Sequence, residues 1–504
     1  MKPAKKLLLN TLALTAVSLL MRTIGMSFGV YLSNAIGPEG IGLFELIMSV
    51  YTLGVSLAAS GVRLSTTRLV VEARSRGSHS DRQVMALCIR YALTLGLVAG
   101  LILFSGAALI ARAMLRVSEA AGALRILAFG LPFLAVSSSL GGYFTARRKA
   151  ARFAATQLLE QLLRIGVTLA ALRLVLPLGV AYAPMALVVG SCTAEVLSTG
   201  IAYGLFRVEL RGQSGRKAAS PLLKRLLAIA VPDAVGSWVR SALVTAKNLL
   251  IPRGLEKTGA SAQSALALYG TLQGMVLPVL TFPSAFLSAL AGLLVPEVAE
   301  SAALGHRTHI RYILGRVIHV TMVFSVAVAG ALFIFAQPLG EAIYPGKGTG
   351  LFIRLLAPVV PVMYLDMMVD SALKGLGHQL SSMRYNIVDA AMSLSLVWLL
   401  IPRLGIWGYC LTFYASELLN FYLSMGKLMK ETGTGLGFAR SFVGPAAAMG
   451  VAGMMARPFL PQLSGHGPLI AAILGCLAIY AAMLALLGCV RQEDIRWLRS
   501  VVGK

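Results

Sequence analysis

The chain has 504 residues, of which 57% are hydrophobic and 13% are charged, against about 25% charged residues in a typical soluble domain. This composition excludes a soluble protein, because too few polar side chains remain to cover a water-exposed surface. The net charge of +25 comes from 45 Lys and Arg against 20 Asp and Glu. No basic soluble domain or tail carries that charge, so we predict no nucleic-acid partner.

Apolar stretches recur along the whole chain, and each bilayer span takes about 20 residues. We therefore predict an all-α polytopic membrane protein with about 14 transmembrane helices. The apolar run after Lys2, Lys5 and Lys6 has no small-residue cleavage site, so we interpret it as a retained first helix. The predicted spans are 7–32, 41–71, 84–110, 124–145, 153–176, 182–206, 226–251, 262–298, 313–335, 351–373, 385–401, 407–425, 438–456 and 469–490.

Lys and Arg are distributed unequally between alternate loops. An N-terminus placed inside assigns 28 of them to the inner loops and 8 to the outer loops. Cytoplasmic loops collect Lys and Arg, so we predict both termini in the cytoplasm. The five cysteines lie inside apolar segments without metal-type spacing, and we interpret them as packing residues. We predict no metal site, no cofactor and no enzyme, since the loops are short and carry no phosphate-binding or nucleophile motif.

An internal repeat is visible in rare charged residues. Arg125 recurs as Arg354 and Glu160 as Asp389, both displaced by 229 positions, and Glu195 recurs as Glu417 with a smaller displacement. An even number of helices in each copy makes the two copies parallel, and such repeats place a transporter's substrate at their interface. The predicted domains are an N-lobe at 1–206, a basic cytoplasmic linker at 207–225, a C-lobe at 226–430, two further helices within 431–490 and a cytoplasmic tail at 491–504.

Cations inside the spans are the main candidates for substrate binding, because an ionisable residue in a membrane needs a cavity or a partner. They are Arg22, Arg63, Arg68, Arg240 and Lys247. Guanidinium groups suit phosphate, so these residues predict a cavity for a multiply charged anion such as a pyrophosphate. The alternative is that neighbouring carboxylates or carbonyls satisfy them, and Arg68 could simply extend to the membrane surface.

Acids inside the spans predict either ion coupling or structural pairing. Glu160 has Arg164 one turn later, so a structural pair and an ion-coupling site are both open. Asp233 follows Pro232, where we expect a simple kink; the alternative is a helix break, whose freed backbone groups can help to bind an ion. Asp389 is the repeat counterpart of Glu160 and shares its two interpretations. We expect Glu195 and Glu417 to pair with arginines between helices, and Arg125 and Arg354 to be structural charges of the repeat.

Three further motifs carry a family resemblance. In the first part of the chain, the matching segments are Arg22 to Gly25, Gly37 to Phe44, and Gly61 to Arg63 with its continuation to Glu72. They resemble the opening of polysaccharide flippases of the stage V sporulation protein B type. The loop from Gly375 to Gln379 is similar to the loop of that family at the same place. The resemblance spans essentially the whole chain and agrees with the predicted helix count.

The resemblance implies membership of the multidrug/oligosaccharidyl-lipid/polysaccharide exporter superfamily, with two six-helix lobes in a V and two C-terminal helices that form a groove for a lipid tail. The related lipid II flippases use cavity cations on helices one, two and eight. Arg22 and Arg63 match the first two, but the eighth span, 262–298, has no Arg or Lys. Arg240 on helix seven is expected to substitute, and this departure argues against lipid II itself as the substrate.

The function implied is an alternating-access flippase in a bacterial cytoplasmic membrane. It would move an undecaprenyl-pyrophosphate-linked saccharide, a precursor of cell wall, spore cortex or polysaccharide, with membrane lipids as further partners. Na⁺, H⁺ or the membrane potential would drive it. The alternative is a cation-coupled multidrug antiporter of the same superfamily, which would favour a cavity dominated by carboxylates. An integral-membrane sugar or lipid transferase is a remote alternative, since it would need a catalytic loop.

Overall fold

The computed structural model describes residues 3–76, 80–175, 177, 182–210, 222–433, 435, 439–462, 465–490 and 494. Within these residues all regular structure is helical, and 14 long helical stretches follow one another along the chain. Ten of the described helices are long and apolar enough to cross a membrane. The predicted all-α polytopic fold is therefore confirmed. The middle of the predicted linker, the predicted tail apart from Asp494, and the side chains of Lys2, Lys5 and Lys6 lie outside the described residues.

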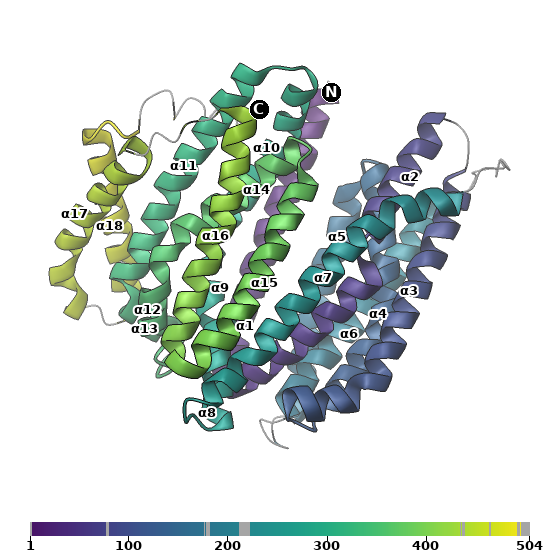
Figure 1. Cartoon of the computed structure of the whole chain (residues 1–504), viewed down its shortest axis with the longest axis horizontal. Helices are drawn as coiled ribbons and strands as arrows, with labels where there is room; N and C mark the ends of the chain where they lie inside the picture. Colours follow the sequence, from purple (N-terminus) through teal and green to yellow (C-terminus); the bar gives the residue numbers. More distant parts are fainter. Residues whose placement is uncertain are drawn as a thin grey trace. The chain divides into compact units, whose positions relative to one another are not determined.

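The chain forms two compact units, which we call unit 1 and unit 2. Unit 1 contains residues 1–28 and 39–253, and unit 2 contains residues 29–38 and 254–504. The elements of unit 1, drawn in purple to teal in Figure 1, are most of α1 (Pro3–Ala59), α2 (Val62–Arg76), α3 (Asp81–Leu109), the π-helix η1 (Ile110–Leu115), α4 (Ala120–Ala146), α5 (Ala150–Val175), α6 (Ala183–Glu209) and α7 (Leu222–Glu256).

Helix α1 contains the first predicted span and most of the second, and a local break separates them. Gly37 has φ 74° and ψ 174°, and Pro38 follows it. Only glycine adopts this backbone conformation readily, and proline disfavours helical geometry in the residue before it. The residues just before this break belong to unit 2, where Asn34 donates a hydrogen bond to the carbonyl of Ile343 (3.0 Å). The sequence therefore encodes the change of unit at Gly37 and Pro38.

Helix α7 packs inside unit 1 against α1. Trp238 Nε1 donates to the Ser56 carbonyl (2.9 Å), and Thr245 Oγ1 donates to the Ser49 carbonyl (2.9 Å). At the turn between α1 and α2, Gly61 has φ 74°, and a Cβ there would lie 2.3 Å from the Ala230 carbonyl oxygen. Contacts thus group α7 with the first six helices, whereas the predicted lobes place it after a boundary at 207–225. The division into lobes by repeat stays a prediction.

Unit 2 contains helices interrupted at prolines. The eighth predicted span, 262–298, changes helix type several times, and Pro278 and Pro283 lie at the starts of two of its pieces, where proline's missing backbone donor is tolerated. The elements are α8 (Ala262–Gly270), η4 (Thr271–Val276), α9 (Leu277–Thr281), η5 (Phe282–Ser284), α10 (Ala285–Ala303), α11 (Arg307–Ile334), α12 (Ala336–Ile343), α13 (Thr349–Leu356), η6 (Ala357–Val359), α14 (Val360–Gly375), α15 (Gln379–Leu404) and α16 (Ile406–Thr432).

The last helices pack on α11 (Figure 1, yellow beside green). They are η7 (Ala439–Val443), α17 (Gly444–Ala456), η8 (Arg457–Gln462) and α18 (His466–Leu486). The Tyr480 hydroxyl donates to the Val323 carbonyl (2.8 Å), which ties α18 to α11. Met449 fills the space above Gly330, where a Cβ would lie 2.2 Å from its side chain. The two predicted C-terminal helices are therefore packed parts of unit 2.

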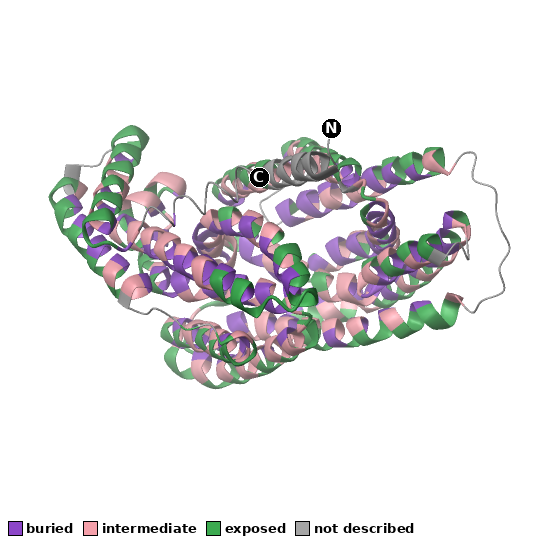
Figure 2. Cartoon of the chain, turned by 90° about the horizontal axis from the view of Figure 1, so that it is seen from above, coloured by how far each residue is buried: buried purple, intermediate pink, exposed green. Residues whose placement is uncertain are grey.

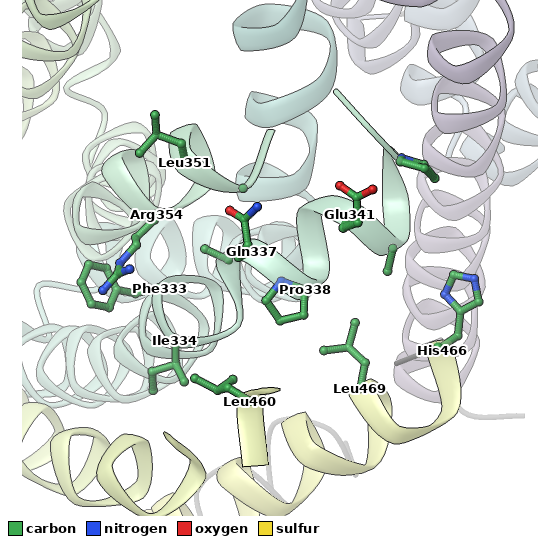
Figure 3. Close-up of a pocket in the computed structure, with 15 residues that line it drawn as sticks. Phe333, Ile334, Gln337, Pro338, Glu341, Leu351, Arg354, Leu460, His466 and Leu469 are labelled. Carbon is green, nitrogen blue, oxygen red and sulfur yellow. The ribbon is translucent and has the colours of Figure 1, made fainter. Parts of the chain in front are cut away.

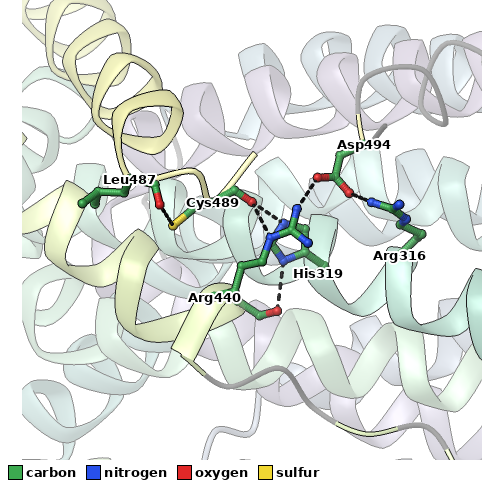
Figure 4. Close-up of polar contacts among 7 residues, drawn as sticks. Arg316, His319, Arg440, Leu487, Cys489 and Asp494 are labelled. Carbon is green, nitrogen blue, oxygen red and sulfur yellow. Dashed lines mark hydrogen bonds and ion pairs between the residues drawn. The ribbon is translucent and has the colours of Figure 1, made fainter. Parts of the chain in front are cut away.

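A buried polar cluster also joins α11 to η7 and to Cys489 and Asp494, which follow α18 (Figure 4). Asp494, 2% exposed, accepts hydrogen bonds from Arg316 of α11 and from Arg440 Nη2 of η7 (2.6 Å). His319 contacts the Ser441 hydroxyl (2.9 Å) through Nδ1 and the Cys489 carbonyl (3.0 Å) through Nε2. One carboxylate between two guanidiniums thus joins three separate segments of the chain.

Large apolar side chains are exposed on many helices. Figure 2 marks the exposed residues of each helix in green. On α3 alone, Leu97, Val98, Leu101, Ile102 and Leu109 are more than half exposed. A soluble monomer rarely exposes such continuous apolar surface. In a bilayer the same surface is favourable, and helices satisfy their own backbone hydrogen bonds there. The chain is a multi-pass membrane protein.

Candidate functional site

All five predicted cavity cations lie in unit 1. Arg22 on α1 and Lys247 on α7 are half-buried, while Arg63 and Arg68 on α2 and Arg240 on α7 are exposed. The sequence assigned Arg240 and Lys247 to the C-lobe. Because α7 packs on α1 and α2, the cations of helices one, two and seven share one compact unit.

Arg63 sits where α2 touches α4 at backbone level. A Cβ at Gly142 would lie 2.7 Å from the Arg63 carbonyl oxygen, and Thr67 Oγ1 donates to the Gly142 carbonyl (3.1 Å). Glycine is therefore needed at 142 for this close approach. The Arg63 guanidinium lies 5.8 Å from the centroid of the Phe153 ring, a cation–π contact that leaves its donors available. The backbone of Arg63 is thus held rigidly while its side chain stays exposed.

Glu160 is the centre of a buried polar cluster between α5 and α6. It accepts hydrogen bonds from Arg164 Nη2 (2.6 Å), Gln157 Nε2 (3.0 Å) and Ser198 Oγ (3.2 Å). Glu195 on α6 is half-buried and interacts electrostatically with both Glu160 and Arg164. Arg164 pairs with Glu160, and three donors already occupy that carboxylate.

Asp233 lies half-buried on α7, which runs without interruption from Leu222 to Glu256. The alternative of a helix break at Pro232 is therefore wrong, and Pro232 lies inside the helix. Packing of α7 on α1 and α2, including the close approach of Gly61 to Ala230, holds the helix together despite the donor that proline lacks. The role of Asp233 in ion coupling stays a prediction.

Unit 2 has its own polar cluster, between α14, α15 and α16. Asp389 Oδ1 accepts from Ser416 Oγ (2.5 Å), and Asp366 Oδ2 accepts from Asn420 Nδ2 (2.8 Å). Asp370 accepts from Lys374 Nζ on its own helix (2.6 Å). Asp366 interacts electrostatically with both other carboxylates, and Lys374 pairs with Asp370.

Two oxygens in this cluster lack a hydrogen-bond partner among the described residues. They are Asp366 Oδ1 and Asn420 Oδ1, both buried. An unpaired buried oxygen costs about 1–3 kcal/mol. A proton or cation bound between these two oxygens would remove that cost. No group of three or more His, Cys, Asp or Glu in the described part of the chain is arranged to hold a metal ion.

The sequence flagged Asp389 but not its hydroxyl and amide neighbours. A signal was present, because Ser382, Asn386, Asp389 and Ser393 recur at spacings of three or four residues and so share one face of α15. The Ser393 hydroxyl donates to Ser416 (2.8 Å) and thereby extends the cluster from α15 to α16. The partners on α14 and α16 come close to α15 only through tertiary packing, so no spacing within one helix predicts them.

The repeat appears in the geometry of both units. The Arg125 guanidinium lies 5.7 Å from the Phe104 ring centroid in unit 1, and Arg354 lies 5.0 Å from Phe333 in unit 2. Phe104 and Phe333 are displaced by the same 229 positions as the two arginines. Glu195 and Glu417 are both half-buried, on α6 and α16.

A family model described as Polysaccharide biosynthesis protein matches residues 7–296. Stage V sporulation protein B of Bacillus subtilis (strain 168) is 24% identical over 513 residues, which cover 98% of each chain. The solved inward closed conformation of the lipid II flippase MurJ has a TM-score of 0.70 at 12% identity, and it covers 94% of this chain and 98% of its own.

The solved inward-facing conformation of a multidrug resistance MATE family transporter of the MOP superfamily has a TM-score of 0.60 at 17% identity, over 84% of this chain and 100% of its own. The fold is therefore that of membrane transporters, as the sequence predicted. The family model covers more than half of the chain, and the chain belongs to the polysaccharide biosynthesis protein family.

Proposed function

We propose that the protein is an alternating-access flippase that moves an undecaprenyl-pyrophosphate-linked saccharide across the cytoplasmic membrane, with both termini in the cytoplasm. The observation that carries the proposal is the set of five cations on three helices of unit 1, in a chain similar over 98% of its length to stage V sporulation protein B. A pyrophosphate needs several cations together, and a polyprenyl tail can stay in the bilayer while the saccharide crosses.

Within this set, Arg22, Arg63 and Arg240 hold the pyrophosphate. Guanidinium groups bind phosphate oxygens in pairs, and such charge-assisted bonds are about twice as strong as neutral ones. Arg63 presents its donors from a rigid backbone, and Arg240 is exposed on the helix that packs against α1. Lys247 continues the row along α7, and Arg68 lies nearer the predicted cytoplasmic end of α2.

The acids of unit 2 provide the coupling step in this proposal. Glu160 has three donors, one of them Arg164, and so resembles a structural pair. Asp389 accepts a hydrogen bond from a serine hydroxyl, and nearby Asp366 has a buried oxygen with no hydrogen-bond partner in the described part of the chain. Carboxylate, hydroxyl and amide oxygens are the ligands that hard cations take, so Na⁺ or H⁺ could bind there and bias the cycle.

The test compares purified wild-type protein with the triple variant Arg22→Gln, Arg63→Gln, Arg240→Gln in a liposome flipping assay, with native mass spectrometry of co-purified lipid. We expect a polyprenyl-pyrophosphate saccharide on the wild type only, and flipping reduced at least about tenfold in the variant. The matched control is Arg112→Gln, an exposed arginine of η1 outside the set. Unchanged flipping in a folded triple variant would refute the site.

A cation-coupled multidrug antiporter is the second candidate, because a MATE family transporter shares the fold and unit 2 carries three neighbouring acids. That function predicts resistance to cationic drugs on overexpression. Loss of resistance in Asp389→Asn, together with no glycolipid bound to the wild type, would favour the antiporter over the flippase.

A further inference from the structure

The two copies of the repeat agree in their contacts and differ at a few positions. Figure 3 shows Arg354 beside the Phe333 ring, the contact that repeats Arg125 beside Phe104. In the second copy, Arg354 also lines two cavities, of about 840 Å³ and about 760 Å³, whose walls include helices that follow the repeat. A second difference lies in the turn between α4 and α5 and its counterpart between α14 and α15.

These two turns have the same backbone geometry, displaced by 229 positions. Each ends its helix with a left-handed residue, which is Arg148 (φ 57°) in the first copy and Gly377 (φ 83°) in the second. The next residue, Lys149 or His378, donates its backbone N–H to the carbonyl five positions earlier, at 2.8 Å in both copies. This is a common way for a helix to end. Lys149 and His378 therefore hold the same place in the two turns.

Each of these two side chains faces a glutamate at the end of a later helix. Glu209 ends α6 and Glu431 lies at the end of α16, displaced by 222 positions, as are the half-buried glutamates of the same helices. Lys149 Nζ lies 2.9 Å from Glu209 Oε1. His378 Nε2 lies 3.6 Å from Glu431 Oε2. The same contact between a turn and a helix end thus has a lysine in unit 1 and a histidine in unit 2.

The two glutamates differ in the source of their other cation. Arg152, near the start of α5, also pairs with Glu209 (2.6 Å), so two cations from across the turn hold that carboxylate. The counterpart of Arg152 in the second copy is a serine. Glu431 instead pairs with Lys427 of its own helix (2.7 Å), and a pair within one helix joins no two elements. Among the ion pairs of the described residues, His378 alone connects Glu431 to the turn.

Further charged groups lie on the elements that pack around this contact. They include Lys374 with Asp370 on α14 (2.6 Å), Arg384 on α15, Lys430 on α16, His306 and Arg307 at the start of α11, and His309 of α11 with Glu297 of α10 (4.0 Å). Arg311 of α11 donates to the Thr432 carbonyl (3.3 Å), so it binds the backbone at the end of α16. Within the described chain, the ion pairs that reach the Glu431 carboxylate come from Lys427 and His378.

A histidine at this place makes the contact depend on pH. Lysine keeps its charge throughout the physiological range, whereas an imidazole ordinarily gains its proton as the pH falls through about 6.5. The hydrogen bond from Lys427 holds the pKa of the Glu431 carboxyl below its usual range, so that carboxylate stays ionised over the same interval. The ion pair of unit 2 therefore forms in mildly acid solution and is lost as the pH rises, while the ion pair of unit 1 persists.

We propose that His378 and Glu431 form a pH-sensitive latch at the predicted cytoplasmic end of unit 2, which closes as the cytoplasm becomes more acid. The latch joins the turn between α14 and α15 to the end of α16. The same helices carry Asp366 and Asn420, so acid conditions strengthen the packing of the elements around that polar cluster. The latch goes beyond the proposed transport, because it forms whether or not a saccharide moves.

Hydrogen–deuterium exchange of the full-length protein in detergent at pH 6 and pH 8, corrected for intrinsic exchange rates, measures the opening of the latch. Both side chains are about one-third exposed (33% and 36%), and such a pair shifts an equilibrium by about two- to fivefold. We expect amide protection at 373–379 and 429–433 to be higher by this factor at pH 6. The turn at 144–149 is the internal control, with equal protection at both pH values.

Four variants separate the latch from other effects of pH. His378→Lys reproduces the first copy and should give high protection at both pH values, and His378→Gln should give low protection at both. Glu431→Gln should abolish the pH dependence while the histidine remains. His309→Gln, which changes the other His–Glu pair, should preserve it. Equal protection of the wild type at both pH values, a pH dependence that survives Glu431→Gln, or its loss in His309→Gln would overturn the proposal.

Discussion

Glu160 accepts hydrogen bonds from donors on two helices, and we expect its charge to stabilise unit 1. Its buried carboxylate receives Arg164 and Gln157 from α5 and Ser198 from α6. We expect Arg164→Gln to destabilise unit 1 more than Glu160→Gln does, because it leaves an ionised carboxylate buried without a cation. The difference in free energy of unfolding should be about 1–3 kcal/mol.

Thermal unfolding of both single variants and the double variant in detergent measures this effect. A double-mutant cycle should give a coupling energy of about 1 kcal/mol or more between the two residues. Additive effects of the two substitutions would show that the ion pair adds no stability and would reopen Glu160 as an ion-coupling residue.

The turn between α1 and α2 packs closely against α7. At Gly61 the backbone is left-handed and a Cβ would lie 2.3 Å from the Ala230 carbonyl oxygen. We expect Gly61→Ala to lower the stability of unit 1 by about 1–3 kcal/mol through strain and displacement of α7. Gly166→Ala on α5, where a Cβ meets nothing within 4 Å, is the control and should leave stability equal or slightly raised.

Asp494 is the acid of the polar cluster that joins the C-terminal segment to α11. Asp494→Asn removes the charge between Arg316 and Arg440, and we expect a loss of about 3–5 kcal/mol, because two guanidiniums lose their buried partner. Limited proteolysis with the cleavage sites mapped by mass spectrometry, together with thermal unfolding, measures the release of α17 and α18 from α11.

The control for this loss is Glu431→Gln at the end of α16. A hydrogen bond from Lys427 lowers the pKa of the Glu431 carboxyl, so the pair is ionised at neutral pH and is lost only as the pH falls through that lowered pKa. Glu431 is solvated, so its removal should change stability little. Similar losses in both variants would show that the Asp494 contacts contribute no more than a surface pair.

In the proposed transport cycle, the acids of unit 2 bind the coupling ion and the cations of unit 1 bind the substrate. We expect Asp389→Asn to keep the fold, since an asparagine oxygen still accepts from Ser416, while flipping loses its dependence on Na⁺ or pH. Asp370→Asn is the control, because Lys374 already neutralises that carboxylate at 2.6 Å. Flipping rates in liposomes at several Na⁺ concentrations and pH values test both variants. An intact ion dependence in Asp389→Asn would exclude it as the coupling residue.

The sequence by itself determined the membrane class, the succession of helices and the repeat. Each span is a local apolar run long enough for the bilayer, and a helix satisfies its own backbone bonds, so neighbours are not needed to define it. The rare charges Arg125, Glu160, Arg354 and Asp389 made the repeat visible, because few charges occur in apolar spans.

Only the tertiary structure decided which helices share a unit and which polar groups meet. Helix α7 joined unit 1 through hydrogen bonds to residues about 180–200 positions earlier, such as Trp238 to Ser56. The pairing of Asp366 with Asn420 and the cavities at Arg354 depend on which faces of distant helices pack together. These helices are apolar on nearly every face. The sequence therefore shows that each face lies against lipid or protein, but it does not show which helix packs there.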